Sequence, residues 1–149
     1  MKKIGFIGLG HMGAPIAEGL LNSGCDVLGY DLSESAYANF QGPKTKHLKD
    51  VALHAQVIIT MLPSGVELMS LYQQQELISH LSKDTLLIDC STIGPIAAQK
   101  FHALPYPTVD APVSGGVVAA QNNQLAYMIG ADEPFASQAE TIFKPISKQ

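Results

Sequence analysis

The chain has 149 residues, of which 46% are hydrophobic and 15% charged, with a formal net charge of −4. This size and composition suffice for one domain with an ordinary core and exclude a disordered chain. All nine positively charged side chains are lysines. Without arginine the usual base-reading and phosphate-clamping groups are missing, so nucleic-acid binding is not expected. Cys25 and Cys90 lie too far apart for a disulfide framework or a metal knuckle, which suits a reducing compartment.

The N-terminus superficially resembles a signal peptide. Its apolar run ends at His11, contains several glycines and is followed by no small-residue cleavage site. No stretch approaches the roughly 18 apolar residues that a membrane span requires. We therefore expect a soluble, cytoplasmic protein with no membrane partner.

Short apolar segments alternate with amphipathic ones along the chain. The apolar segments lack period-2 alternation and predict strands buried on both faces, at residues 3–8, 26–30, 56–62, 85–89, 107–110 and 125–129. The amphipathic segments predict helices at residues 12–22, 34–40, 66–81, 95–103, 116–122 and 134–143. This alternation is typical of βαβ units, so we expect a doubly wound, mostly parallel α/β sheet of the Rossmann type, in a single domain over residues 1–149. Residues 41–49 are expected to form a solvated loop.

The first predicted turn carries the pattern G-x-G-x-x-G. Gly8, Gly10 and Gly13 permit a tight turn, close approach of the backbone to a pyrophosphate and close packing of helix on strand. The helix N-terminus offers unpaired amides to phosphates. Asp31 follows the second strand, where it can accept hydrogen bonds from an adenosine ribose. A carboxylate repels a 2′-phosphate, so NAD is favoured over NADP, although Lys44 or Lys46 could reach such a phosphate. The alternative is a glycine-rich turn with no ligand.

Later motifs sharpen this interpretation. They are Met61-Leu62-Pro63, Asp89-Cys90-Ser91-Thr92-Ile93-Gly94-Pro95 and Asp110-Ala111-Pro112-Val113-Ser114-Gly115-Gly116. With the opening segment KIGFIGLGHMG, they make the whole chain resemble the β-hydroxyacid dehydrogenases of the 3-hydroxyisobutyrate dehydrogenase and tartronate semialdehyde reductase type. 6-Phosphogluconate dehydrogenase is a more distant relative, which the Ser-Thr-Ile stretch fits poorly.

The resemblance implies roles for particular positions. The cofactor-binding residues would be Gly8, Leu9, Gly10, His11, Met12, Gly13, Asp31, Leu62, Pro63 and Thr92. Ser114, Gly115 and Gly116 match the substrate-binding motif. Their chemistry agrees, because a serine and two glycines before a helix offer an N-cap and bare amides that could hold a carboxylate. The alternative is that these three residues form only a turn.

The family's general acid/base is a lysine within a glycine-containing motif, at the start of a second, helical domain. No position in this chain matches that motif, and Lys100, Lys144 and Lys148 are predicted to be solvated. We therefore expect no catalytic residue here. The chain would be the cofactor domain of an NAD-dependent 3-hydroxy acid dehydrogenase, inactive alone and homo-oligomeric at full length. Alternatives are a tartronate semialdehyde or glyoxylate reductase, and a non-catalytic dinucleotide-binding module.

Other candidate groups favour structural interpretations. The histidines show no metal-ligand spacing, so no metal is expected. Asp89 and Asp110 end predicted strands and are interpreted as caps of the following turns rather than as a catalytic pair. Cys90 is interpreted as a small packed residue.

Overall fold

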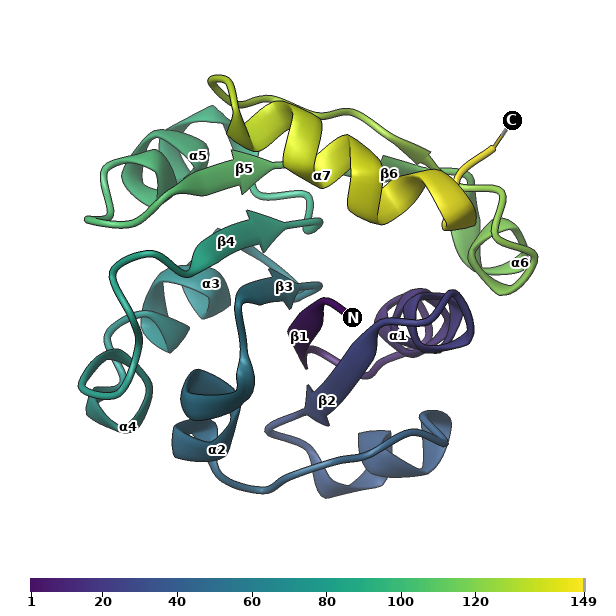
Figure 1. Cartoon of the computed structure of the whole chain (residues 1–149), viewed down its shortest axis with the longest axis horizontal. Helices are drawn as coiled ribbons and strands as arrows, with labels where there is room; N and C mark the ends of the chain where they lie inside the picture. Colours follow the sequence, from purple (N-terminus) through teal and green to yellow (C-terminus); the bar gives the residue numbers. More distant parts are fainter. Residues whose placement is uncertain (149) are drawn as a thin grey trace.

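A sheet of parallel strands forms the centre of the computed structural model, which describes residues 1–148 (Figure 1). Its strands are β1 (Lys3–Ile7), β2 (Asp26–Tyr30), β3 (Val57–Thr60), β4 (Leu86–Asp89) and β5 (Thr108–Asp110). They lie in the order β2-β1-β3-β4-β5. The order reverses between β1 and β3, and at such a switch point the loops leaving the two strands diverge and open a crevice. The expected doubly wound sheet is confirmed.

Helices cover both faces of the sheet (Figure 1). One face packs against α1 (Gly13–Asn22), α6 (Gly116–Gln121) and α7 (Phe135–Phe143), and the other against α2 (Leu48–His54), α3 (Gly65–Leu71), α4 (Gln75–Ile78) and α5 (Gly94–His102). Successive strand residues alternate between the two cores, as Phe6 and Ile7 of β1 do. Because both faces are covered, the strands read as continuous apolar runs. The structure also contains two 3₁₀ helices, η1 (Glu34–Asn39) and η2 (Lys144–Ile146).

The predicted sixth strand is wrong. Within the predicted segment 125–129, only Ala126–Tyr127 form a strand (β7), which pairs antiparallel with β6 (Val113–Ser114) outside the main sheet. Residues 111–124 are long enough for a parallel crossover. Their helix, α6, packs beside α1 and does not carry the chain across to a free edge of the sheet. The segment instead turns back, and Gly130 exchanges backbone hydrogen bonds with Asp110 beside β5.

Two predictions about the middle of the chain also need correction. Residues 41–49 are not wholly a solvated loop, because buried Leu48 begins α2 and packs with Val51 and Ala52 at helical spacing. The single helix predicted over residues 66–81 is two helices, α3 and α4. Buried Leu68, Leu71 and Tyr72 lie on one stripe, and Leu77 is out of phase with it. The chain must break between them to bury both sets.

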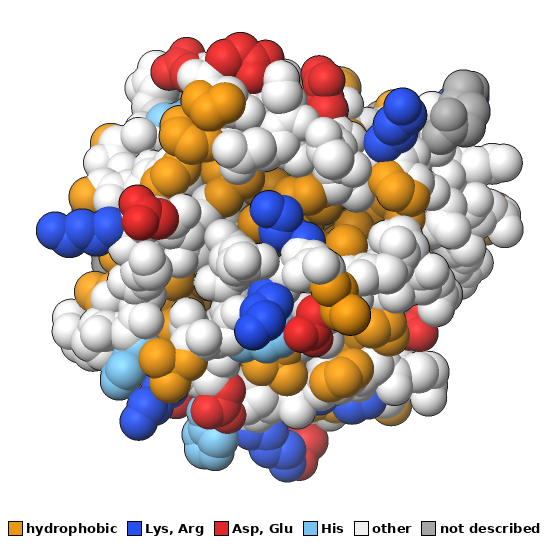
Figure 2. Space-filling model, viewed as in Figure 1, with side chains coloured by type: hydrophobic (Ala, Val, Ile, Leu, Met, Phe, Trp, Pro, Cys, Tyr) orange, Lys and Arg blue, Asp and Glu red, His pale blue; other side chains and the backbone are white. Residues whose placement is uncertain are grey.

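Charged side chains of both signs are interspersed on the face of the molecule seen in Figure 2, with hydrophobic side chains exposed between them. No helix within residues 1–148 is long and apolar enough to cross a membrane.

Candidate dinucleotide site

The turn between β1 and α1 is built around three glycines with different surroundings. Gly8 has φ +109°, and a Cβ there would lie 2.1 Å from the carbonyl oxygen of Met61. At Gly13 a Cβ would lie 1.8 Å from the carbonyl oxygen of Gly8. Gly10, by contrast, has nothing within 4 Å of a built Cβ. Gly8 and Gly13 thus allow backbone to pack on backbone, whereas Gly10 leaves an open face that a ligand can approach.

The start of α1 presents backbone donors at this open face. The amides of Gly10, His11 and Met12 donate to no acceptor within residues 1–148, and the first bond of the turn runs from the Ala14 amide to the Gly10 carbonyl oxygen at 3.0 Å. α1 has ten residues, so its dipole adds partial positive charge at this end. No side chain caps it. An anion is the natural acceptor for these amides.

Asp31 holds the glycine turn from the end of β2. Its Oδ2 accepts a hydrogen bond from the Leu9 amide at 2.7 Å, and its Oδ1 accepts one from the Ser33 amide at 2.7 Å. Asn39 Nδ2 donates to the Leu9 carbonyl oxygen at 3.0 Å. Both backbone polar groups of Leu9 are therefore held by side chains from the β2–η1 segment. Each carboxylate oxygen retains lone-pair capacity for a further donor.

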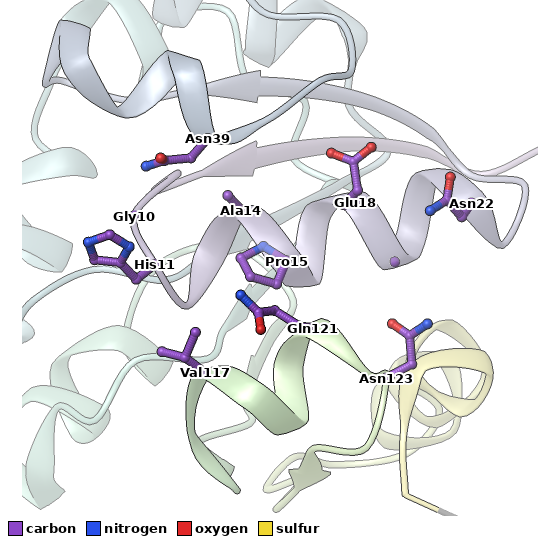
Figure 3. Close-up of a pocket in the computed structure, with 11 residues that line it drawn as sticks. Gly10, His11, Ala14, Pro15, Glu18, Asn22, Asn39, Val117, Gln121 and Asn123 are labelled. Atoms are coloured by element: carbon purple, nitrogen blue, oxygen red, sulfur yellow. The ribbon is translucent and has the colours of Figure 1, made fainter.

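A groove of about 330 Å³ begins at Gly10 and His11 and runs along α1 (Figure 3). Val117 and Gln121 of α6 form its opposite wall, and Asn123 lies near its far end (Figure 3). The structure thus brings α6, which begins at the last residue of the Ser114-Gly115-Gly116 motif, next to the start of α1. Sequence reasoning did not anticipate this groove, because it depends on the turn of the chain after β5.

The Ser114 motif differs in detail from the expectation. Ser114 belongs to β6, and Gly115, not the serine, occupies the N-cap position of α6. The serine side chain therefore does not cap the helix. Gly115 and Gly116 have φ values of +137° and +79°, and all three residues are exposed. The motif leaves bare backbone at the surface, in a conformation that favours glycine.

Leu62 and Ser91, in the loops after β3 and β4, are joined by a hydrogen-bond network that ends on buried Asp89. The Leu62 amide donates to Ser91 Oγ at 2.8 Å, and Ser91 Oγ donates to Asp89 Oδ1 at 2.7 Å. Burial raises the pKa of Asp89 to about 6, against hydrogen bonds from Ser91 and Thr60 that lower it. Asp89 does accept from the turn that follows it, as expected from the sequence. Pro63 and Thr92 are exposed beside this network.

The remaining candidate groups lie apart from the glycine turn. Asp110 is paired in register with Asp89 on β5, and burial raises its pKa while His102 lowers it. Cys90 is fully buried, and burial raises its pKa well above the ordinary value. Lys100, Lys144 and Lys148 are exposed. Within residues 1–148 no cluster of His, Cys, Asp and Glu side chains could hold a metal ion.

Asn39, Thr60 and Ser91 were not singled out from the sequence. Asn39 lies in a 3₁₀ helix and reaches the glycine turn only through the fold. Ser91 stood within a recognised motif, yet its partner Leu62 is 29 residues away in sequence. The clue available was that both residues follow adjacent parallel strands, whose carboxyl ends share one edge of the sheet.

A doubly wound sheet whose first turn exposes free amides at a helix N-terminus, with an acidic residue after the second strand, defines a dinucleotide-binding domain. The family described as the NAD binding domain of 6-phosphogluconate dehydrogenase matches residues 3–149, and the chain belongs to it.

Individual relatives confirm the resemblance drawn from the motifs. The chain is 36% identical over 156 residues to the NAD-dependent L-serine dehydrogenase of Pseudomonas aeruginosa, covering 99% of this chain and 52% of that protein. It is 36% identical over 148 residues to human mitochondrial 3-hydroxyisobutyrate dehydrogenase, covering 93% and 44%. The structure of Mycobacterium tuberculosis 3-hydroxyisobutyrate dehydrogenase with L-serine matches with a TM-score of 0.90 at 34% identity, covering 100% of this chain and 53% of that one. The chain thus spans about half the length of these relatives.

Proposed function

We propose that this chain is the cofactor domain of an oxidoreductase that moves hydride between NAD and a short-chain 3-hydroxy acid. The observation that carries the proposal is the set of unpartnered amides of Gly10, His11 and Met12 at the open face of the glycine turn. Their position suits the pyrophosphate of a dinucleotide. The other residues proposed for the cofactor are Gly8, Leu9, Gly13, Asp31, Leu62, Pro63 and Thr92.

The surroundings of Asp31 favour NAD over NADP. Its carboxylate is fixed by the Leu9 and Ser33 amides, so it cannot easily swing away from a 2′-phosphate. The lysines that could neutralise such a phosphate are engaged elsewhere. Lys46 pairs with Glu34 at 2.5 Å, and Lys44 donates to the carbonyl oxygen of Phe40. We therefore expect at least about tenfold tighter binding of NAD, which corresponds to roughly 1.4 kcal/mol.

The substrate class is proposed from the chemistry shared by the relatives' names. L-Serine and 3-hydroxyisobutyrate both carry a carboxylate and a hydroxyl on carbon 3, and they differ in an amino or methyl group on carbon 2. We propose that Ser114, Gly115 and Gly116 contact the carboxylate, because their exposed backbone lies before the helix that faces the glycine turn. A tartronate semialdehyde or glyoxylate reductase is the alternative within the same class.

Oxidation of such an alcohol transfers a hydride from carbon to the nicotinamide while a base takes the hydroxyl proton, leaving a carbonyl. None of the residues that line the groove beside the glycine turn is a lysine. A positioned acid/base contributes about 10²–10⁴ in rate. We therefore propose that the 149-residue chain alone binds NAD without useful turnover. Homo-oligomerisation of the full-length protein and a cytoplasmic location stay predictions.

Calorimetric titration of the chain with NAD and with NADP tests this function. We expect NAD to bind more tightly than NADP. Asp31→Asn should reduce the difference between the two affinities, because it removes the charge that repels the 2′-phosphate. Lys83→Gln, a change at an exposed lysine remote from the turn, serves as the control. Absence of NAD binding would overturn the proposal. Turnover of 3-hydroxyisobutyrate or L-serine by the chain alone, followed by NADH absorbance, would overturn its predicted inactivity.

A further inference from the structure

A chain of buried hydrogen bonds connects the loops that leave β3 and β4. Thr60 ends β3 and is paired in register with Asp89 at the end of β4. Thr60 Oγ1 and Ser91 Oγ each donate to Asp89 Oδ1 at 2.7 Å. The Leu62 amide donates to Ser91 Oγ at 2.8 Å. Thr60, Asp89 and Ser91 are each 0% exposed, so water does not compete for the two bonds to Asp89.

Placing an ionisable carboxyl group at position 89 is energetically unfavourable. Burial disfavours its charge and raises its pKa to about 6, and the neighbouring carboxylate of Asp110 acts in the same direction. Its second oxygen, Oδ2, has no hydrogen-bond partner within residues 1–148. The nearby hydroxyl of Tyr72 is also buried and has no hydrogen-bond partner within residues 1–148. It carries no positive charge that could stabilise the Asp89 carboxylate. A merely structural position would be filled at less cost by an apolar side chain.

The geometry explains what the carboxylate contributes. A serine hydroxyl has one proton and two lone pairs, and its proton is free to rotate. When Ser91 donates that proton to Asp89 Oδ1, a lone pair is left to accept from Leu62. Without an acceptor at Oδ1 the hydroxyl can rotate, and the Leu62 amide loses a fixed partner.

We propose that Asp89 is a positioning residue for the cofactor site, which orients Ser91 and through it ties the loop after β3 to the loop after β4. This inference rests on the proposed function, because Leu62, Pro63 and Thr92 are the residues proposed to contact the cofactor in these loops. Proton uptake on the unpartnered Oδ2 leaves Oδ1 able to accept both bonds, so the tie needs an oxygen at Oδ1 rather than a negative charge.

Amide hydrogen exchange of Leu62, followed by NMR, directly measures the protection that its hydrogen bond to Ser91 provides, and it needs no cofactor. Ser91→Ala removes the acceptor, and we expect Leu62 exchange to rise about 3- to 10-fold, the range of one net hydrogen bond. Asp89→Ala leaves Ser91 unoriented and gives an increase of the same order. Asp89→Asn keeps a carbonyl oxygen at Oδ1 and restores protection to within about twofold of the wild-type value. The matched control is Thr85→Val, which removes a buried hydroxyl with no partner within residues 1–148, at the other end of the strand.

NAD affinity provides the second measurement. We expect Ser91→Ala and Asp89→Ala to weaken NAD binding about 3- to 10-fold, and Asp89→Asn and Thr85→Val to leave it within twofold. Unchanged Leu62 exchange in Ser91→Ala, or raised exchange in Asp89→Asn, overturns the positioning role. If Asp89→Ala does not fold, comparison of Ser91→Ala with Asp89→Asn still tests the positioning role. If the wild-type chain binds no NAD, the proposed function fails, while the exchange measurement still tests the tie itself.

Discussion

The turn after β1 and the turn after β6 both depend on glycine, but for different physical reasons. At Gly13 a side chain would strike the backbone carbonyl oxygen of Gly8, so the first turn requires glycine by contact. At Gly116 nothing lies within 4 Å of a built Cβ, and the requirement comes from its φ of +79° alone. The first turn is locked by packing between strand and helix, whereas the second is a surface conformation. Glycine is therefore required by close packing in the first turn and by a positive φ in the second.

The largest expected effect comes from breaking the packed turn. Gly13→Ala places a methyl group against the Gly8 carbonyl, and α1 must shift from β1 to accommodate it. We expect the free energy of unfolding to fall by about 3 kcal/mol or more, at the upper end for overpacking. Urea denaturation measures it. A loss below about 0.5 kcal/mol would show that the turn is not packed as described.

The carboxylates of Asp31 and Asp89 give the next effect. Asp31 is partly exposed with both oxygens engaged, whereas Asp89 is fully buried with Oδ2 unpartnered. The folded-state pKa of Asp89, about 6, exceeds its ordinary 3.8, so the folded state binds this proton more strongly. The resulting stabilisation is fully present below pH 3.8 and is lost as the pH rises through about 6.

Asp89→Asn removes this titratable group, so comparison with that variant gives the size of the pH-dependent stabilisation. The free energy of unfolding of wild type, relative to Asp89→Asn, should fall by about 2–3 kcal/mol between pH 4 and pH 7. Denaturant titrations of both proteins across this range measure the difference. Asp110, whose pKa is also raised, contributes a trend of the same sign to both proteins, and its repulsion of the Asp89 carboxylate is part of the difference that the comparison measures. Parallel curves for the two proteins would contradict the burial of an ionised Asp89.

The second glycine turn should respond more mildly. Gly116→Ala meets no neighbour but places a Cβ at a positive φ, which costs about 1–2 kcal/mol. Gly116→Asn should lose less, because asparagine tolerates this region better than alanine. At Gly13 the order should reverse, because the larger side chain clashes more. Equal losses for alanine and asparagine at Gly116, in thermal or urea unfolding, would mean that its backbone conformation is not the determinant.

The smallest effect on stability is expected at Gly10. With nothing within 4 Å of its built Cβ, Gly10→Ala should change the free energy of unfolding by no more than about 0.5 kcal/mol. NAD affinity should nevertheless fall about tenfold or more, because the methyl group occupies the face that the pyrophosphate would approach. Calorimetry on a folded variant separates the two quantities. Undiminished NAD binding would place the cofactor elsewhere.

Sequence alone predicted the features that rest on local backbone constraints. Gly8, Gly10, Gly13 and Asp31 stand at fixed offsets around one strand–turn–helix unit, so their spacing carries the geometry. β7 was mispredicted because an apolar run does not say which strand it pairs with, and here it pairs antiparallel with β6. The clamp of Asn39 on Leu9 and the tie from Asp89 through Ser91 to Leu62 join residues distant in sequence. Only the packed sheet brings them together.

Chemical-shift mapping by NMR tests the central claim most directly, because it observes individual amides while NAD is added to the chain. The account predicts saturable shifts concentrated at the amides of Gly10, His11 and Met12, with smaller changes along α7, none of whose residues lines the groove beside the glycine turn. Saturable shifts that leave these three amides unmoved, or no shifts at all, would contradict it.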